Sequence, residues 1–186
     1  MSYDINLRDP VTKETINFAD SHQMRGGTYV VGGTTEAWLN ITYNYSEYYY
    51  EATENDPRFF GKLPDDYDNE PERNLGIRGI YGKTGAETLK MISDMIHRIE
   101  SKYKKDGEWI TTERRETVRL DENGKGVSFT EWLKIGGKFR EKEVTRMVWE
   151  GPDQDYWKDT AGNAVRPLYQ LLTFCQLRPD GVWEGD

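Results

Sequence analysis

The sequence has little cysteine or histidine and no long apolar run, and each shortage argues against a class of protein. The single cysteine, Cys175, cannot form a disulfide framework or a cysteine-based zinc site. The two histidines, His22 and His97, are 75 positions apart and do not favour a histidine-rich metal site. No apolar run approaches the roughly 18 to 20 residues that a membrane-spanning helix needs. We therefore expect no metal, no cofactor and no membrane contact.

The first residues and the acidic balance point to the compartment and the partners. The segment MSYDINLRDP lacks the basic and apolar regions of a signal peptide, so we expect a soluble cytoplasmic protein. The formal net charge of −8 and a pI near 5.0 argue against direct binding of nucleic acid, because nucleic-acid binders are usually basic. A chain of 186 residues fits one domain, with or without an inserted subdomain.

The charge is spread unevenly along the chain. Residues 51–72 carry a net charge of −6, whereas residues 98–149 carry +3. Three prolines lie among the acids of the first of these segments. This composition predicts that residues 54–74 form an exposed acidic loop, because it offers little apolar surface to bury.

The first third of the chain has the alternating pattern of β-strands. Apolar and polar residues alternate around Ile5 and Ile16, and the turn at Asp9 between them predicts a hairpin. Glycine pairs bracket a short strand at 28–31.

Residues 37–45 alternate over a longer stretch, which predicts a further strand. Residues 46–53 either extend this strand or begin a short helix at Ser46.

Two segments have the pattern of helices. Thr84 and Glu87 have the capping-box spacing. The apolar stripe that follows them consists of Leu89, Ile92, Ile96, Ile99 and Tyr103. A last helix is expected from about 164 to 177, with Pro167 in its first turn. Its buried stripe is expected to contain Leu168, Leu171, Leu172 and Cys175.

Between these helices, the turn signals at Asn123-Gly124 and Gly136-Gly137 predict about three strands, although 128–133 also fits a helical turn. The fold class that follows is α+β. We expect a single domain over 1–186, with a mainly antiparallel sheet, two principal helices on one of its faces, and a β-rich insertion at about 104–152.

Three local motifs suggest binding rather than catalysis. Gly82-Lys83-Thr84 lacks the glycine spacing of a phosphate-binding P-loop. It is either a capped turn or a helix start that holds a phosphate. The ligand site of the second reading consists of Lys83 and Thr84, with Tyr43 and Tyr45 stacking on a base.

The tyrosine-rich run at 43–50 suits either a binding surface or a core. The acidic run at 65–70 lacks the glycine and the terminal glutamate of a calcium loop. It is either a solvated loop or a surface that competes for a basic groove. The residues expected to contact a partner are Tyr48, Tyr49, Tyr50, Asp65, Asp66, Asp68 and Glu70.

Catalytic motifs are absent from the sequence. Neither histidine is near a recognisable nucleophile motif, and Cys175 lies on an apolar stripe that predicts a buried, inert thiol. We assign no catalytic residue and expect a protein that is not an enzyme.

Three segments resemble a known group of proteins. They are GGTYVVGGTTEAWLNITYNY at 26–45, GIYGKTGAE at 79–87, and the stretch from Asp155-Tyr156-Trp157 to Arg178-Pro179-Asp180-Gly181-Val182-Trp183. They resemble small acidic proteins of phages, prophages and other mobile elements, over about 1–50, 76–99 and 155–186. The resemblance brings no catalytic residue. It implies a counter-defence role of the anti-CRISPR type, in the cytoplasm of the host cell.

The sequence therefore supports one principal hypothesis and two alternatives. The principal hypothesis is a mobile-element protein that inhibits a host nucleic-acid-guided nuclease of the Cas9 type by binding its basic nucleic-acid surface. One alternative is a nucleotide-binding protein that sequesters a phosphorylated signal molecule. The other alternative is a small enzyme that acts on a nucleotide-like substrate.

Overall fold

The computed structural model describes residues 2–23, 33–63, 71–103, 107–136, 138–153 and 155–186. The chain forms two compact units. The first, which we call the body, comprises 1–108 and 150–186. The second, the inserted unit, comprises 109–149 and corresponds to the predicted β-rich insertion. Helices and antiparallel strands together confirm the α+β class.

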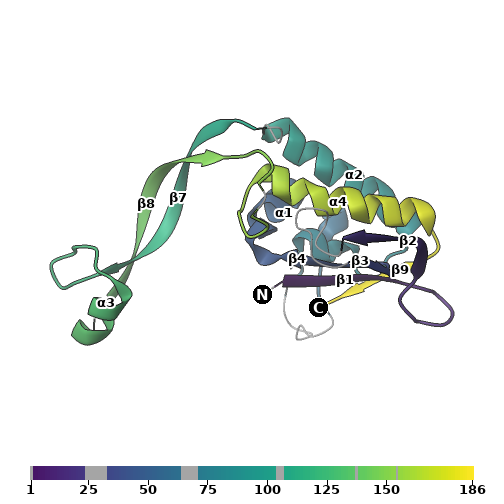
Figure 1. Ribbon diagram of the computed structural model, residues 1–186, viewed down its shortest axis with the longest axis horizontal. Coiled ribbons are helices and arrows are strands. Elements are labelled where there is room, and N and C mark those ends of the chain that lie inside the picture. Colours follow the sequence, from purple (N-terminus) through teal and green to yellow (C-terminus); the bar gives the residue numbers. More distant parts are fainter. Residues whose placement is uncertain (1, 24–32, 64–70, 104–106, 137, 154) are drawn as a thin grey trace. The chain divides into compact units, whose positions relative to one another are not determined.

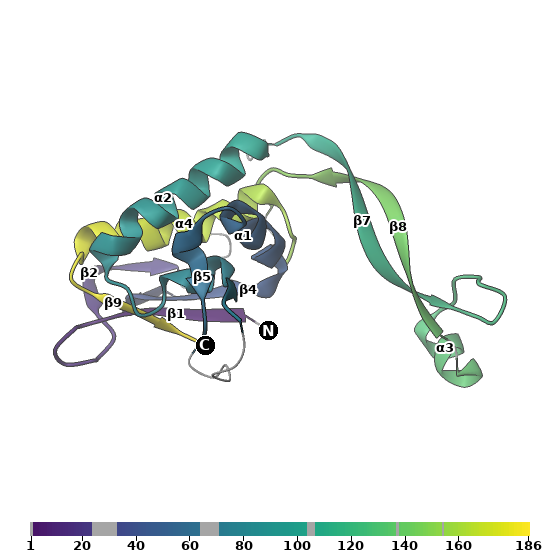
Figure 2. The same cartoon turned by 180° about the vertical axis from the view of Figure 1, so that it is seen from behind.

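The body is built on a three-stranded antiparallel sheet in the order β4 (Trp38–Thr42), β1 (Ser2–Arg8) and β9 (Val182–Gly185). The central strand β1 alternates buried and half-buried residues, as the pattern around Ile5 predicts. The helices α2 (Gly85–Lys102) and α4 (Ala161–Leu177) run side by side along one face of this sheet (Figures 1 and 2). The sheet and the two helices share one hydrophobic core.

Two short strand pairs flank the central sheet. The first of them uses a strand, β2 (Asn17–Gln23), that was expected to form a hairpin with β1. β2 pairs with β3 (Gly33–Glu36), and β5 (Phe60–Gly61) pairs with β6 (Arg73–Asn74). The turn after β1 is present, but only one bridge, Arg8 to Thr15, joins its two sides. The prediction of a hairpin is wrong beyond that bridge, because β1 already pairs with β4 on one edge and with β9 on the other. The predicted strand at 28–31 lies outside the described residues.

The tyrosine-rich run is helical rather than extended. β4 ends at Thr42, whose hydroxyl accepts a hydrogen bond from the Asn44 backbone N–H and so begins the 3₁₀ turn η1 (Tyr43–Tyr45). The helix α1 (Ser46–Thr53) follows directly. The prediction of a strand to residue 45 is therefore wrong in its last three residues, and the alternative of a helix that begins at Ser46 is confirmed.

The prediction of an exposed loop over 54–74 is wrong at both ends of this range, which are the parts that the structure describes. These ends contain the 3₁₀ turn η2 (Pro57–Phe59) and the pair β5–β6, and the further 3₁₀ turn η3 (Gly76–Ile80) follows them. Phe59 is fully buried, and Asp56 is almost fully buried. Phe59 gives this segment the apolar anchor that its overall composition did not suggest. Residues 64–70 lie outside the described part of the chain.

The capping box of α2 is confirmed, with Thr84 and Glu87 each satisfying the other's backbone N–H. The predicted stripe is correct at Ile92, Ile96 and Ile99, but Leu89 is 36 % exposed, and Tyr103 lies just beyond the end of the helix and is half-buried. At about 100° per residue, Leu89 lies at the edge of the buried face rather than on it. The buried face consists of Thr88, Met91, Ile92, Met95, Ile96 and Ile99.

These two positions of α2 give a matched pair for a stability measurement. Ile96 is 5 % exposed and belongs to the core, so Ile96→Ala should lower the free energy of unfolding by about 2 to 4 kcal/mol. Leu89→Ala should cost about 0.5 kcal/mol or less, because the side chain is already at the surface. Urea unfolding followed by circular dichroism measures both. Equal losses would show that α2 does not bury the face described here.

The helix α4 begins earlier than predicted. Thr160 caps it by accepting a hydrogen bond from the Asn163 N–H, and Pro167 is therefore inside the helix rather than in its first turn. The placement of Pro167 in the first turn is wrong because Thr160 starts the helix three residues before the expected position. Leu168, Leu171 and Cys175 are buried as predicted.

The inserted unit is a two-stranded antiparallel ribbon with a helix between its strands. β7 (Trp109–Leu120) pairs with β8 (Lys138–Trp149) in one continuous register. The helix α3 (Phe129–Ile135) has a capping box at Ser128 and ends at Gly136, whose φ of 60° favours glycine. The expectation of three strands is wrong, and the helical alternative at 128–133 is confirmed.

Over the described ranges, no helix is long and apolar enough to cross a membrane.

Candidate functional site

Most of the tyrosine-rich run belongs to the core. The buried Tyr45, Tyr48 and Tyr49 donate their hydroxyl hydrogens to internal acceptors. The donor and acceptor atoms are Tyr45 Oη to the Tyr156 carbonyl at 2.6 Å, Tyr48 Oη to Glu150 Oε2 at 2.7 Å, and Tyr49 Oη to the Ala164 carbonyl at 2.9 Å. Burial also raises the pKa of Tyr49 well above its usual value.

This burial decides which of the tyrosines are accessible. Tyr48 and Tyr49 were predicted to contact a partner, and that prediction is wrong because both are 3 % exposed or less. Tyr45 is equally enclosed and cannot stack on a base as predicted. Tyr50 is 39 % exposed and Tyr43 is half-buried, so these two remain at the surface. Residues three or four apart in α1 face inward. Because this helix has only eight residues, the helical periodicity cannot be recognised in the sequence.

The predicted phosphate site at Lys83 and Thr84 is closed. The backbone N–H groups of Gly85 and Ala86 donate to the carbonyls of Gly181 and Pro179, both at 2.8 Å. The Glu87 N–H donates to the Thr84 hydroxyl, and Lys83 Nζ donates to the Gly79 carbonyl at 2.6 Å. A phosphate needs free N–H groups at a helix start, and these groups are already bonded. The ligand prediction for Lys83 and Thr84 is therefore wrong, and the capped-turn reading holds.

The acidic residues divide into two groups. Asp65, Asp66, Asp68 and Glu70 lie outside the described residues, and their contact with a partner stays a prediction.

Asp56, by contrast, is part of an internal ion cluster. Its carboxylate binds Arg58 and Arg98 at 2.5 and 2.9 Å, and Arg58 also binds Asp94 at 2.7 Å. Hydrogen bonds from Arg58, and then from Arg98, lower the pKa of Asp56 well below its usual value. This cluster ties η2 to α2 and is structural.

The candidate catalytic groups do not converge. Cys175 is buried as predicted, and burial raises the pKa of its thiol. His22 lies beside Phe174, with 4.8 Å between the ring centroids, and burial lowers its pKa. In the described part of the chain, the one side-chain hydrogen bond of His22 is to the Trp38 carbonyl at 3.3 Å. The same residues contain no group of three His, Cys, Asp or Glu that could hold a metal ion.

A groove with a volume of about 340 Å³ opens beside His22, between β2 and α4. It is lined by Phe18, His22, Phe174 and Leu177 together with smaller polar residues. Five of its nine lining residues are polar, namely Asp20, Ser21, His22, Gln170 and Thr173, so the composition does not single out one class of ligand.

A second group, which reaches the surface through Tyr50, surrounds Arg78, and we call it the Arg78 cluster: Tyr3, Tyr43, Tyr50, Arg78 and Tyr81. The Arg78 guanidinium carbon lies 5.3 and 5.5 Å from the ring centroids of Tyr3 and Tyr43. One guanidinium nitrogen of Arg78 donates to the Tyr43 hydroxyl at 2.8 Å. Tyr43 and Tyr50, which the sequence singled out, thus belong to one surface, and Arg78 was not foreseen there.

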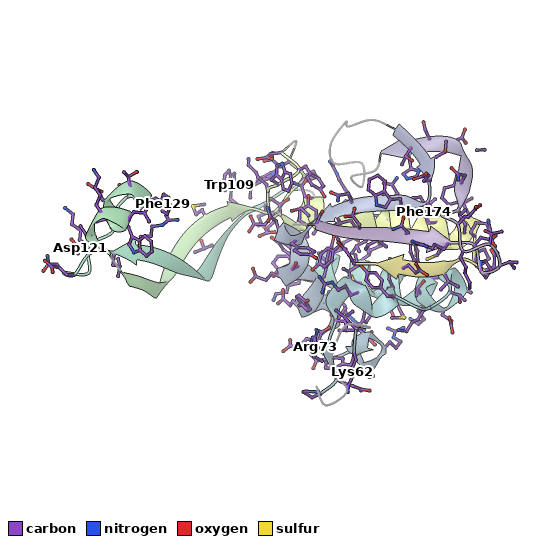
Figure 3. The ribbon with its side chains drawn as sticks, turned by 90° about the horizontal axis from the view of Figure 1, so that it is seen from below. Lys62, Arg73, Trp109, Asp121, Phe129 and Phe174 are labelled. Atoms are coloured by element: carbon purple, nitrogen blue, oxygen red, sulfur yellow. The ribbon has the colours of Figure 1, made fainter. Side chains whose placement is uncertain are left out.

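The inserted unit displays five of the large apolar side chains that are exposed on the described surface. Trp109 and Met147 are 61 and 67 % exposed, and Phe129, Leu133 and Ile135 are each more than half exposed. Figure 3 shows Phe129 and Asp121 at one end of this unit and Trp109 at the other. At the Trp109 end, Trp109 is directly opposite Trp149, with 5.7 Å between their ring centroids. No side chain described in this unit is buried.

The sequence carries a compositional signal for this surface. Phe129, Trp132, Leu133 and Ile135 fall within seven residues between glycines. A helix of that length has no room to bury four large side chains against a two-stranded ribbon.

No family model, no curated protein and no solved structure matches this chain.

Proposed function

We propose that this protein acts by binding another protein, and that the inserted unit supplies the principal contact surface. The partner we propose is a nucleic-acid-guided nuclease of the Cas9 type, which the protein would inhibit as a counter-defence factor of a mobile element. The choice of partner comes from the resemblance of residues 26–45, 79–87 and 155–183 to mobile-element proteins.

One observation carries the binding role. The inserted unit is an ordered ribbon and helix of 41 residues, yet none of its described side chains is buried. Large apolar side chains are exposed both on α3 and at the Trp109 end of the ribbon, and exposed apolar surface of this kind marks a site that contacts something. A two-stranded ribbon is also marginally stable by itself, so a partner that covers it would stabilise it.

Charge supports the choice of a basic partner surface. The inserted unit has nine Lys or Arg and seven Asp or Glu, a net charge of +2, so the body carries −10. A body of that charge is attracted to a groove built for phosphates, and the attraction speeds the encounter. The apolar residues of the inserted unit would then supply the contact area that holds the complex together.

The test is binding and inhibition measured together. The wild-type protein is immobilised and exposed to a guide-loaded Cas9-type nuclease, and cleavage of a target duplex is followed in parallel. The expected result is a saturable complex whose formation slows as salt rises, with cleavage lost at saturating protein. Binding to no nuclease of this type, with cleavage unchanged, would overturn the choice of partner.

A further inference from the structure

The Arg78 cluster contains a cation that has no acidic partner within the described part of the chain. The other arginines that bridge elements of the body are paired. Arg58 and Arg98 bind Asp56, and Arg178 binds Asp9 and Asp180. Arg78 is half-buried, and among the residues that the structure describes no carboxylate lies within ion-pair distance of it. This is unexpected in a body with a net charge of −10, where an acidic neighbour is easily supplied.

The hydrogen-bonding capacity of Arg78 is also largely unused. A guanidinium has five N–H donors, and the described structure satisfies one of them by a side chain, through the Tyr43 hydroxyl. The Arg78 Nε is buried and finds no acceptor among the residues that the structure describes. A buried donor without an acceptor costs about 1 to 3 kcal/mol, so a native protein that keeps one needs a reason for it.

The tyrosines around Arg78 do not neutralise it. Burial raises the pKa of Tyr3 to about 12 and raises that of Tyr81 as well, so both phenols are uncharged at neutral pH. The ring faces of Tyr3 and Tyr43 hold the guanidinium in place, and the Tyr43 hydroxyl hydrogen has no acceptor in the described residues. The backbone just before Arg78 is consistent with this arrangement. Gly76, two residues before Arg78, has a φ of 57° and packs against the ring of Tyr50.

We propose that the Arg78 cluster is a binding site for an oxyanion, either a carboxylate or a phosphate group. The guanidinium of Arg78 supplies the charge and the forked donors that both groups accept. The hydroxyl of Tyr43 supplies a further donor, and the exposed ring of Tyr50 contacts the rest of the ligand. This site lies in the body, and it does not depend on the partner proposed for the inserted unit.

The test uses the Nε–Hε signals of the arginines in an NMR titration of the intact, labelled protein. Inorganic phosphate, acetate and chloride are added separately at constant ionic strength. We expect the Arg78 signal to shift in a saturable manner with phosphate or acetate, while the signal of Arg178, already paired with Asp9 and Asp180, stays in place. A response to only one of the two oxyanions identifies which group the site takes.

Two variants separate a site from general charge attraction. Arg78→Gln should abolish the saturable response, and Tyr43→Phe should weaken it about fivefold, the effect of one hydrogen bond. Tyr43→Phe removes one oxygen, so it keeps the test valid if Arg78→Gln does not fold. The proposal is overturned by an equal response to chloride, by no saturable response, or by a response that Tyr43→Phe leaves unchanged.

Discussion

Replacing Phe129 and Leu133 together by serine should weaken binding to the partner by about 100-fold or more. Both side chains are more than half exposed on α3, so their loss removes contact area without opening a cavity. Truncation of a large apolar residue at the centre of an interface costs roughly 2 kcal/mol or more, and each 1.4 kcal/mol is a factor of ten in affinity. The dissociation constant of the variant for the guide-loaded nuclease measures this effect.

The matched control is Val11→Ser. Val11 is 85 % exposed, but it lies in the turn after β1 and not in the inserted unit. It should bind like the wild type, and both variants should keep the wild-type melting temperature within about 2 °C. If the double variant binds as tightly as the control, α3 does not contact the partner, and the inserted unit loses its proposed role.

Trp183→Ala should lower the free energy of unfolding by about 3 to 5 kcal/mol. Trp183 is the largest fully buried side chain of the described core, and its indole Nε1 donates to the Thr88 hydroxyl at 2.8 Å. The substitution therefore creates a cavity and removes a hydrogen bond that joins β9 to α2. Urea unfolding followed by circular dichroism at 222 nm gives the value without relying on tryptophan fluorescence.

Two comparisons make this measurement specific. Trp183→Phe keeps an aromatic ring but loses the N–H, and its cost should be smaller than that of alanine. Trp157→Ala removes a tryptophan that is 52 % exposed and should cost about 1 kcal/mol or less. A loss at Trp183 no greater than the loss at Trp157 would mean that β9 does not anchor the core.

The fold was most predictable where a local pattern and the tertiary structure agree. The capping box at Thr84 and Glu87 and the alternation in β1 depend on neighbours in the sequence, and both are confirmed. The predictions failed where a distant partner decides. β1 takes β4 and β9 as neighbours instead of β2, and nothing in the sequence near β1 specifies those partners. The start of α4 was missed for a local reason, because the capping residue Thr160 lies just before the expected helix and places Pro167 inside it.

The candidate sites were less predictable than the fold. Composition marked the tyrosines, but it could not separate Tyr49, whose hydroxyl meets the Ala164 carbonyl, from the exposed Tyr50 beside it. Arg78 has no motif around it, and its significance depends on its surroundings in space, where the described residues place no carboxylate within ion-pair distance. The exposed face of α3 has a clear composition, yet only the tertiary structure shows that its large side chains are left without a core.

The Glu150 backbone N–H donates to the Glu108 carbonyl at 3.1 Å, so the chain leaves the body and returns to it at neighbouring points. An insertion anchored in this way can be exchanged as a cassette in a single recombination event. Descendants could then acquire a different ribbon while the core that folds the protein is inherited unchanged. This separation would let the exposed surface of the inserted unit diverge faster than the stability of the body.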